Sequence, residues 1–436
     1  MRFVLGSRRE DRMSHSHGSS TGRTLTPLVE HLHAPTELDH AKGRLKVLIC
    51  AYACEPDRGS EEGAGWNWTV AAARDHDVWV LTREHDPGVQ RAALAEEGVE
   101  ATFEHVKLPR WLDSVRRWEH VYYSVWKVAA AVRARELHEE NGFDLVHHLT
   151  WSNVWLPSPC AAVRVPFVHG PVGGGPCVPL ALFPLLGAKG ALKELLRAGK
   201  HLASRVNPFT RLTWQRATVI VVNNQETLRA LPRRHRPRAV IRHHASVGSD
   251  VLTYVRRSST RGGQTTRLAV MAGRLLPWKG GAAAVRAIAE LDGWQLTIVG
   301  DGPDQRRLRR LAAQLGVNGR IAFVSRLARQ EMLQLMASAD AVLIPSFRDD
   351  SPFVGAEAQT LNVPVVAFAQ GGPAEFARQP NATCFLAKPG LGAIAGLRLA
   401  LVEAGAAPPP DAPPDYSVES IHRDLRAIYA TALQRR

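Results

Sequence analysis

The stretch from Leu268 to Gly281 reads LAVMAGRLLPWKGG and decides the fold of its half of the chain. Its first five residues, Leu268–Ala272, form a continuous apolar run, which is typical of a strand buried in a parallel sheet. Gly273 then opens a loop that carries Arg274 and Lys279 and leads into a helical pattern. Glycines let a backbone approach a ligand closely, and the free N–H groups of a helix N-terminus attract anions. The stretch therefore predicts a strand–helix unit with a diphosphate site; a surface turn with two solvated cations is the alternative for this motif alone.

The same pattern of short apolar runs separated by helical periodicity recurs on both sides of this stretch. The other runs that predict strands are Lys46–Ala51, Val78–Leu81, Leu145–His148, Val165–Val168, Thr218–Val222, Gln295–Val299, Ile321–Val324, Ala341–Ile344 and Pro364–Phe368. The clearest helical patterns are Trp66–Ala73, Pro303–Leu315 and Arg329–Ala337. Alternating strands and helices predict an α/β class with two Rossmann-like α/β/α domains that face each other across a deep cleft.

The length of 436 residues favours two domains, because single cores rarely grow to this size. Residues 1–44 lack periodicity and are predicted to be a disordered leader. We expect a first domain over 45–250 and a second over 251–415, with the boundary near 245–265, where serine, glycine and arginine dominate. After a proline-rich segment, residues 416–436 predict a C-terminal helix that crosses back to the first domain.

Composition and charge exclude several classes of protein. Apolar residues make up 45% and charged residues 22% of the chain, as in ordinary globular proteins. Lys and Arg total 55 against 41 Asp and Glu, a formal net charge of +14 that suggests an anionic partner. The five cysteines are scattered without metal-ligand spacing, so we expect no metal site and a reducing, cytoplasmic location. No signal peptide, membrane span or nucleic-acid-binding signature is visible.

Two further segments follow predicted strands of the second half. The first, Gly300-Asp-Gly302-Pro303, is a tight turn before a helix. The second, Pro345–Ala358, carries Asp349 and Glu357, whose carboxylates suit the recognition of vicinal hydroxyls. The loop amides around Ser351–Val354 suit a phosphate. Each motif alone is also consistent with a structural turn or a solvated acid pair. Together, at the carboxyl ends of parallel strands, they predict a pocket for a nucleotide sugar.

The motifs GRLLPWKGG, GDGP and DDSPFVGAEAQTLNVPVVAFAQGG resemble the donor half of retaining GT-B glycosyltransferases of family 4 (group 1). The resemblance covers about 265–380. The first half resembles bacterial polysaccharide-assembly glycosyltransferases more loosely, through AYACEPDRGSEEGAGWNW and VPFVHGPVGGG. The family implies retaining transfer of a sugar from a nucleotide-diphosphate sugar to a hydroxyl. The acceptor is then a glycan, lipid-linked or small molecule in cell-surface polysaccharide or glycolipid assembly.

The resemblance also implies roles for individual residues. Arg274 and Lys279 are expected to bind the diphosphate and stabilise the departing nucleotide, and Glu357 to hold the ribose. Asp349 is expected to contact the donor sugar, although the family usually has Glu there; Asp350 is the alternative. Further donor-binding positions are Gly273, Gly302, Ser325, Leu327, Ser351, Pro352 and Phe353. The departing diphosphate is expected to accept the acceptor's proton, so neither a base, a metal nor another cofactor is required.

Glycine loops and histidines mark the first half. We expect Gly59–Gly65, with Gly63, and Gly173–Gly175, with Gly173 and Gly174, to be flexible loops that bind the acceptor and cover the donor. Simple strand–helix turns are the alternative. His148 and His169 are candidates for placing the reacting hydroxyl or the donor sugar, because they and His147 fall near predicted strand ends. A structural, hydrogen-bonded histidine is the alternative for each.

Two segments suggest contact with the inner face of an anionic cell membrane. Residues 110–135 contain aromatic residues interspersed with cations, namely Trp111, Trp118, Tyr122, Tyr123 and Trp126. Residues 186–216 hold seven Lys or Arg and one acid, Glu194, with leucines interleaved. A basic amphipathic helix of this kind suits an anionic lipid surface. A helix packed on its own domain with a solvated basic face is the alternative.

Two other functional hypotheses remain beside the glycosyltransferase. One is a non-catalytic GT-B scaffold that uses its basic face to bind an anionic membrane. The other is a GT-B enzyme of different chemistry, such as a sugar-nucleotide epimerase or a phosphorylase. A phosphorylase also needs a lysine that carries pyridoxal phosphate, and no motif here identifies one.

Overall fold

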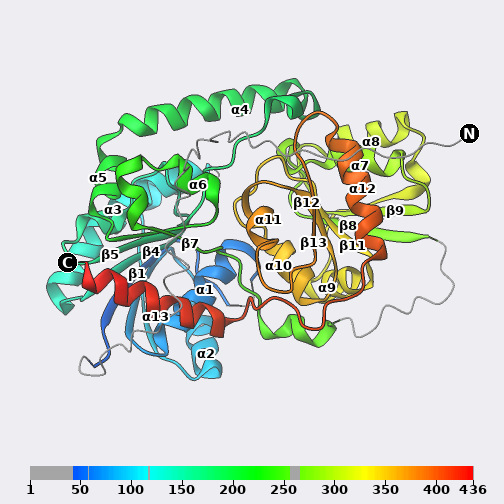
Figure 1. Ribbon diagram of the computed structural model, residues 1–436. Helices are drawn as coiled ribbons and strands as arrows, with labels where there is room; N and C mark the ends of the chain where they lie inside the picture. The colour runs from blue at the N-terminus through cyan, green and yellow to red at the C-terminus, as the bar shows by residue number, and fades with distance from the viewer. Residues whose placement is uncertain (1–42, 57, 116–117, 256–265, 436) are drawn as a thin grey trace, which may run out of the picture.

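The computed structural model describes residues 43–56, 58–115, 118–255 and 266–435, and shows two α/β halves side by side (Figure 1). The predicted leader lies outside the described residues, apart from its last two positions. Each half is built on one parallel sheet. The α/β class and the pair of Rossmann-like domains predicted from the sequence are confirmed.

The first sheet has the strand order β3-β2-β1-β4-β5-β6-β7. Its strands are β1 (Lys46–Ala51), β2 (Asp77–Thr82), β3 (Ala101–His105), β4 (Leu145–Thr150), β5 (Phe167–Val172), β6 (Val219–Val222) and β7 (Ala239–Ile241). The sequence patterns miss β3 and β7, which are edge strands of three to five residues and carry only short apolar runs. They also end β4 and β5 too early, because histidine, glycine or proline interrupts the apolar run of each strand.

The second sheet has the order β10-β9-β8-β11-β12-β13. Its strands are β8 (Arg267–Ala272), β9 (Trp294–Val299), β10 (Ile321–Val324), β11 (Ala341–Ile344), β12 (Val365–Phe368) and β13 (Cys384–Ala387). Five of the six agree with the sequence patterns to within one residue at each end. The edge strand β13 is missed. In both sheets the carboxyl ends of the central strands meet at the cleft between the halves, where ligands of open α/β sheets bind.

Helices cover both faces of each sheet (Figure 1). In the first half they are α1 (Ser60–Ala73), α2 (Pro87–Glu97), α3 (Glu119–Asn141), α4 (Phe183–Val206), α5 (Pro208–Arg216) and α6 (Gln225–Ala230). In the second half they are α7 (Gly281–Ala289), α8 (Gln305–Gln314), α9 (Arg329–Ser338), α10 (Phe353–Thr360), α11 (Gly371–Phe376) and α12 (Ala393–Ala406). The final helix is α13 (Val418–Gln434). Helix α8 begins two residues after Pro303, which instead lies in the turn before it.

The glycine-rich segment after β1 corrects a sequence prediction. Residues 60–65 form the first turns of α1 rather than a flexible loop. A side chain at Gly63 would collide with the carbonyl of Arg58, and one at Gly65 would collide with the carbonyl of Ala53. These glycines therefore allow the start of the helix to pack against the segment that follows β1, and that contact outweighs their low helix propensity.

The chain crosses between the halves twice. Ala245, Val247 and Val251 follow β7 and already pack in the core of the second half. At the other end of the chain, α13 lies along α1 in the first half (Figure 1). Its apolar face, which includes Leu425 and Tyr429, is buried in the first core. Each half thus contributes side chains to the cleft from more than one chain segment.

Helix α4 also connects the halves. Figure 1 shows it as a long helix that runs along one edge of the molecule. Leu182 and Leu186, at its start, pack in the core of the second half. Near its other end, the ring of His201 stacks on Trp155 of the first half with centroids 4.9 Å apart. Within the described ranges, no helix, α4 included, is both long and apolar enough to cross a membrane.

Candidate functional site at the interdomain cleft

The loop after β8 carries the two cations predicted for a diphosphate. Gly273 has a φ of 134°, and Arg274 is exposed to solvent. The loop continues into a short 3-10 helix, Pro277–Lys279, and reaches Gly280, whose φ is 76°. A side chain at Gly280 would collide with the carbonyl of Pro345. Glycine therefore allows this loop to lie directly against the loop that follows β11.

The loop after β11 brings the predicted sugar-contacting acid to the predicted diphosphate cation. The Lys279 Nζ donates to Asp349 Oδ2 at 2.7 Å, and both side chains are partly exposed. The backbone fixes this approach, since the N–H of Phe347 donates to the carbonyl of Trp278 at 2.8 Å. A cation and a carboxylate, 70 positions apart in sequence, thus lie together at the end of the second sheet.

Glu357 lies in the first turns of α10 and is bound by a cation that the sequence patterns do not identify. Arg329, at the start of α9, donates to Glu357 Oε1 at 2.8 Å and to Asp250 Oδ2 at 2.7 Å. Burial raises the pKa of the Glu357 carboxyl, while the neighbouring Arg329 lowers it. Glu357 is thus a largely buried acid that already accepts one strong hydrogen bond.

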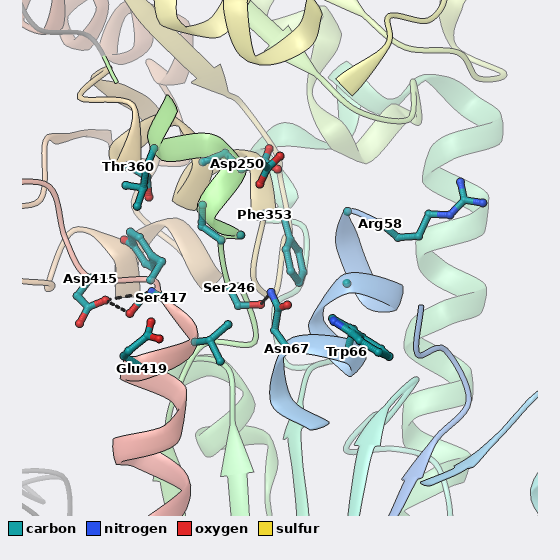
Figure 2. A pocket seen from close by; sticks show the side chains of 18 of the residues that line it. Arg58, Trp66, Asn67, Ser246, Asp250, Phe353, Thr360, Asp415, Ser417 and Glu419 are labelled. Carbon is teal, nitrogen blue, oxygen red and sulfur yellow. Dashed lines mark hydrogen bonds between the residues drawn. The ribbon is translucent and has the colours of Figure 1, made fainter. Parts of the chain in front are cut away.

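Glu357 and Arg329 line a cavity of about 510 Å³ between the halves. Figure 2 shows that its side chains come from α1, the segment after β7, α10 and the start of α13. Phe353 lies on the side of α10, opposite Trp66 and Asn67 of α1. The volume lies within the range of small-molecule sites, and the lining mixes aromatic surface with a few charged groups, as such sites do.

The remaining predicted donor positions surround these two groups. A side chain at Gly302 would collide with the carbonyl of Leu275, so the GDGP turn packs against the diphosphate loop. Ser325 and Leu327 lie in the partly exposed loop between β10 and α9. Ser351 accepts a hydrogen bond from the N–H of Ala245 at 3.0 Å, and Pro352 is the N-cap of α10. Of these positions, Phe353 reaches the cavity.

Asp350 does not stand in for Asp349 at the donor side. Its Oδ1 accepts from the N–H of Gly174 at 2.8 Å, and its backbone carbonyl accepts from Asn224 Nδ2 at 3.1 Å. Burial raises the pKa of its carboxyl, against the lowering effect of the Gly174 hydrogen bond. Asp350 is therefore turned towards the first half and joins the two domains.

The three glycines after β5 are explained by close approach. A Cβ at Gly173 would lie 2.5 Å from Asp350 Cγ, and one at Gly174 would lie 2.6 Å from Asn153 Oδ1. A side chain at Gly175 would collide with the backbone of Thr227. The predicted flexible loop is thus a closely packed segment, in which Gly173 and Gly174 lie at the domain interface and Gly63 belongs to α1.

The structure corrects the placement of the histidines, which lie within strands rather than at exposed strand ends. His148 and His169 are 2% and 0% exposed, and their rings stack with centroids 5.5 Å apart. His147 bonds through its two ring nitrogens to the Tyr429 hydroxyl and the Gly170 carbonyl, at 2.9 and 2.6 Å. Burial lowers the pKa of His147 to about 4 and that of His169 to about 3. All three are thus neutral core groups, and they do not reach the cleft.

Sequence reasoning missed four charged residues that surround the site. Arg329 holds Glu357, and Arg348, Glu194 and Arg197 join the halves beside Asp349. Arg348 is adjacent to Asp349 in the quoted motif, which was a usable signal. The other three come from distant segments, and nothing in their spacing pointed to the cleft.

The comparisons with known proteins agree with this geometry in two steps. Two facing parallel α/β sheets with a cleft at their strand ends are the GT-B fold. Residues 256–397 match the family model described as "Glycosyl transferases group 1". Over this region the chain is similar to the group 1 glycosyltransferases, which confirms the resemblance seen in the sequence.

A curated relative and two solved structures illustrate the likeness. The D-inositol 3-phosphate glycosyltransferase of Mycolicibacterium smegmatis is 29% identical over 262 residues, 56% of each chain. This chain thus spans about half the length of the curated relatives that it matches. HepE of Anabaena, solved with UDP and glucose, has a TM-score of 0.52 at 16% identity and covers 89% of this chain. A Rickettsia africae glycosyltransferase has a TM-score of 0.54 at 14% identity and covers 90% of this chain. All of HepE and of the Rickettsia protein is covered, and at these identities the likeness concerns the fold.

Proposed function

We propose that the protein transfers a sugar from a nucleotide-diphosphate sugar to a hydroxyl of an acceptor. The observation that carries the proposal is the meeting of Lys279 and Asp349, 2.7 Å apart, at the carboxyl end of the second sheet. Glu357 lines the 510 Å³ cavity between the halves, and Arg274 is an exposed cation of the same loop as Lys279. Cations for a diphosphate and carboxylates for hydroxyls are the groups that such a donor requires. The family match and the names of the relatives support the same class of reaction.

The chemistry proposed for these residues is electrostatic. Negative charge develops on the departing diphosphate, and Arg274 and Lys279 stabilise it at the end of the β8 loop. The diphosphate oxygen that leaves the sugar accepts the proton of the acceptor hydroxyl, as the family resemblance implies for transfer with retention. Lys279 then exchanges its contact with Asp349 for the phosphate, and Asp349 becomes available to the sugar hydroxyls. With this charge compensation we propose that the reaction requires no metal ion, so it should persist in EDTA.

Calorimetry with UDP, GDP and ADP tests the donor site. We expect one of them to bind the wild-type protein and to bind the Arg274→Ala and Lys279→Ala variants much more weakly. Arg310→Ala is the matched control, because Arg310 is an exposed arginine of α8 outside the diphosphate loop. If no nucleotide binds the wild type, the donor assignment is wrong and the non-catalytic scaffold is favoured.

We further propose that the acceptor is lipid-linked and that α4 and α5 contact an anionic membrane at its cytoplasmic face. Four leucines of α4 are 57–67% exposed, namely Leu192, Leu195, Leu196 and Leu202. Exposed cations accompany them, namely Lys189, Lys193, Lys200, Arg205 and Arg211. The one acid of this segment, Glu194, is 6% exposed and faces the protein. The outer surface of α4 therefore combines apolar side chains with cations and presents no acid, which suits an anionic lipid surface.

The aromatic residues of 110–135, the other segment predicted to contact a membrane, differ in their exposure. Tyr122, Tyr123 and Trp126 are buried in the first core. Trp111 and Trp118 are 75% and 58% exposed and remain available for contact. The aromatic spacing over 110–135 thus mostly reflects the buried face of α3, and the proposed surface rests on α4 and α5.

Sedimentation with vesicles tests this surface. We expect the wild type to sediment with phosphatidylglycerol-containing vesicles at low salt, but much less with pure phosphatidylcholine vesicles. A Leu195→Ser/Leu196→Ser/Leu202→Ser variant should lose this binding. Leu399→Ser is the matched control, because Leu399 is 61% exposed on α12 of the other half. Equal sedimentation of wild type and triple variant would contradict the proposed surface.

A further inference from the structure

The inner face of α4 contacts two loops of the candidate donor site, those after β8 and β11, and the glycine segment after β5. Gly190 lies against Pro277 of the diphosphate loop, where a Cβ at residue 190 would be 2.9 Å from Pro277 Cβ. Arg197 Nη2 donates to the carbonyl of Pro176, beside the three glycines that follow β5, at 3.2 Å. Glu194 binds Arg348 of the loop after β11. One helix thus contacts loops from both halves of the molecule.

The contact between Glu194 and Arg348 is a buried, bidentate ion pair. Arg348 Nε lies 3.0 and 2.9 Å from the two Glu194 oxygens, and its Nη2 lies 2.9 Å from Oε1. The Glu194 side chain is 5% exposed and that of Arg348 is 18% exposed. Such a fork geometry fixes the orientation of both partners. Removing one partner destabilises the structure, because it leaves the other charge buried without a counter-charge.

Arg348 is linked to both Lys279 and Asp349, the two residues assigned to the donor. It directly precedes Asp349, and its guanidinium lies 4.3 Å from the centroid of the Trp278 ring. Trp278 directly precedes Lys279. The ion pair with α4 therefore fixes the residue next to each member of the Lys279–Asp349 pair.

We propose that Glu194 and Arg348 are positioning residues that hold Lys279 and Asp349 at the donor site. They act from the helix whose outer face is the proposed membrane contact. The inference rests on the proposed function, because it assigns the held residues to the donor. In this arrangement, movement of α4 changes the geometry of the diphosphate loop. A displacement of about 1 Å at such a site is sufficient to lower reactivity on the order of 100-fold.

Hydrogen–deuterium exchange of the ligand-free protein tests the positioning directly. In Glu194→Gln we expect faster exchange of backbone amides over 274–281 and 345–352 than in the wild type. Glu290→Gln is the matched control, because it breaks an exposed Glu–Arg pair of the second half, Glu290 with Arg398, outside these loops. Gly190→Ala, which forces α4 away from Pro277, should raise exchange over 274–281 without removing a charge. Unchanged exchange over both loops in Glu194→Gln and Gly190→Ala would overturn the proposal.

Donor binding and kinetics provide the second readout. With the nucleotide that binds the wild type, Glu194→Gln should bind about 10- to 100-fold more weakly and raise the donor KM more than it lowers kcat. The exchanged pair Glu194→Arg/Arg348→Glu should recover part of this affinity, which would show that the loss comes from the pair and not from either residue alone. If no nucleotide binds the wild type, the proposed function fails, while the exchange experiment still decides whether α4 positions these loops.

Discussion

The strand-end loops of the two halves use glycine and charge in different ways. In the second half, the loops after β8 and β11 present side chains, Lys279 and Asp349, at the cleft. In the first half, the segments after β1 and β5 make close backbone contacts, because Gly63 approaches the carbonyl of Arg58 in the same half and Gly173 approaches Asp350 of the other half. The loops of the second half therefore present charged groups, whereas those of the first half use glycine for close packing within the half and against the partner domain.

This difference explains why sequence motifs predict function more directly in the second half than in the first. A cation in a strand-end loop indicates the ligand chemistry directly, since few structural roles require it. A run of glycines indicates only that other atoms pack closely against the backbone, and the tertiary structure alone shows which atoms these are. The predictions below test this contrast, beginning with the largest expected effect.

Removal of a cation from the second-half loops should have the largest effect. Lys279→Ala and Arg274→Ala should each lower turnover about 100- to 1,000-fold, since each removes a charge that stabilises the departing diphosphate. Initial rates with the donor that calorimetry identifies provide the measurement. Wild-type rates in both variants would mean that the second-half loops do not act through these side chains.

Addition of a methyl group to the first-half glycine loop should mainly affect stability. Gly173→Ala places a Cβ 2.5 Å from Asp350 Cγ, so the domain interface must shift. We expect a loss of about 1–3 kcal/mol in the free energy of unfolding, measured by urea denaturation. Gly199→Ala is the control, because no atom lies within 4 Å of a Cβ there. Equal stability of Gly173→Ala and the wild type would contradict the role of the first-half glycines in close packing.

The buried histidines of the first half should make stability depend on pH. Burial lowers the pKa of His147 to about 4, whereas the unfolded chain has a value near 6.5. As the pH falls below 6.5, the unfolded state takes up a proton that the folded state does not, so the free energy of unfolding decreases until the pH reaches about 4. His147 alone should contribute a loss of about 2 kcal/mol at pH 5. Urea denaturation from pH 7.5 to 5 should show a shallower slope in His147→Asn; an unchanged slope would exclude this role.

The smallest effect on stability is expected on the outer face of α4. Leu195→Ser should change the free energy of unfolding by less than about 0.5 kcal/mol, because Leu195 is 60% exposed. Leu186→Ser, which precedes the kink at Gly187 and is 1% exposed, should be strongly destabilising. Thermal unfolding of the two variants makes the comparison. A large loss in Leu195→Ser would show that this face packs against protein in solution.

Much of the fold was predictable from local patterns. Central strands such as β8 and β11 are continuous apolar runs, because both faces of a parallel sheet are buried. Edge strands such as β3 and β13 are only partly buried and lack that signal. The start of α1 was mispredicted because glycine has low helix propensity, and the contacts that override this preference are made with the segment after β1. The amphipathic pattern of 186–216 predicted a helix, but Pro208 divides the segment into α4 and α5.

The site divides in the same way. Arg274, Lys279, Asp349 and Glu357 were named from sequence; the first three lie in strand-end loops, and Glu357, in α10, lines the cavity. The partners that decide their geometry were not identified as site residues, since Arg329 and Glu194 come from other elements. The histidines were expected at strand ends because the sequence patterns ended β4 and β5 too early. In the structure both strands continue past the histidines, which are therefore buried inside the sheet.

The sequence by itself determined the class of fold, the residues that carry charge at the donor loops, and the basic surplus of 186–216. These follow from periodicity, residue type and counting, which are local properties of the chain. The tertiary structure alone decided that Lys279 meets Asp349, that Asp350 turns to Gly174, and that the one acid of α4 faces Arg348. Pairings between distant segments depend on how the domains pack, and no local pattern encodes that geometry.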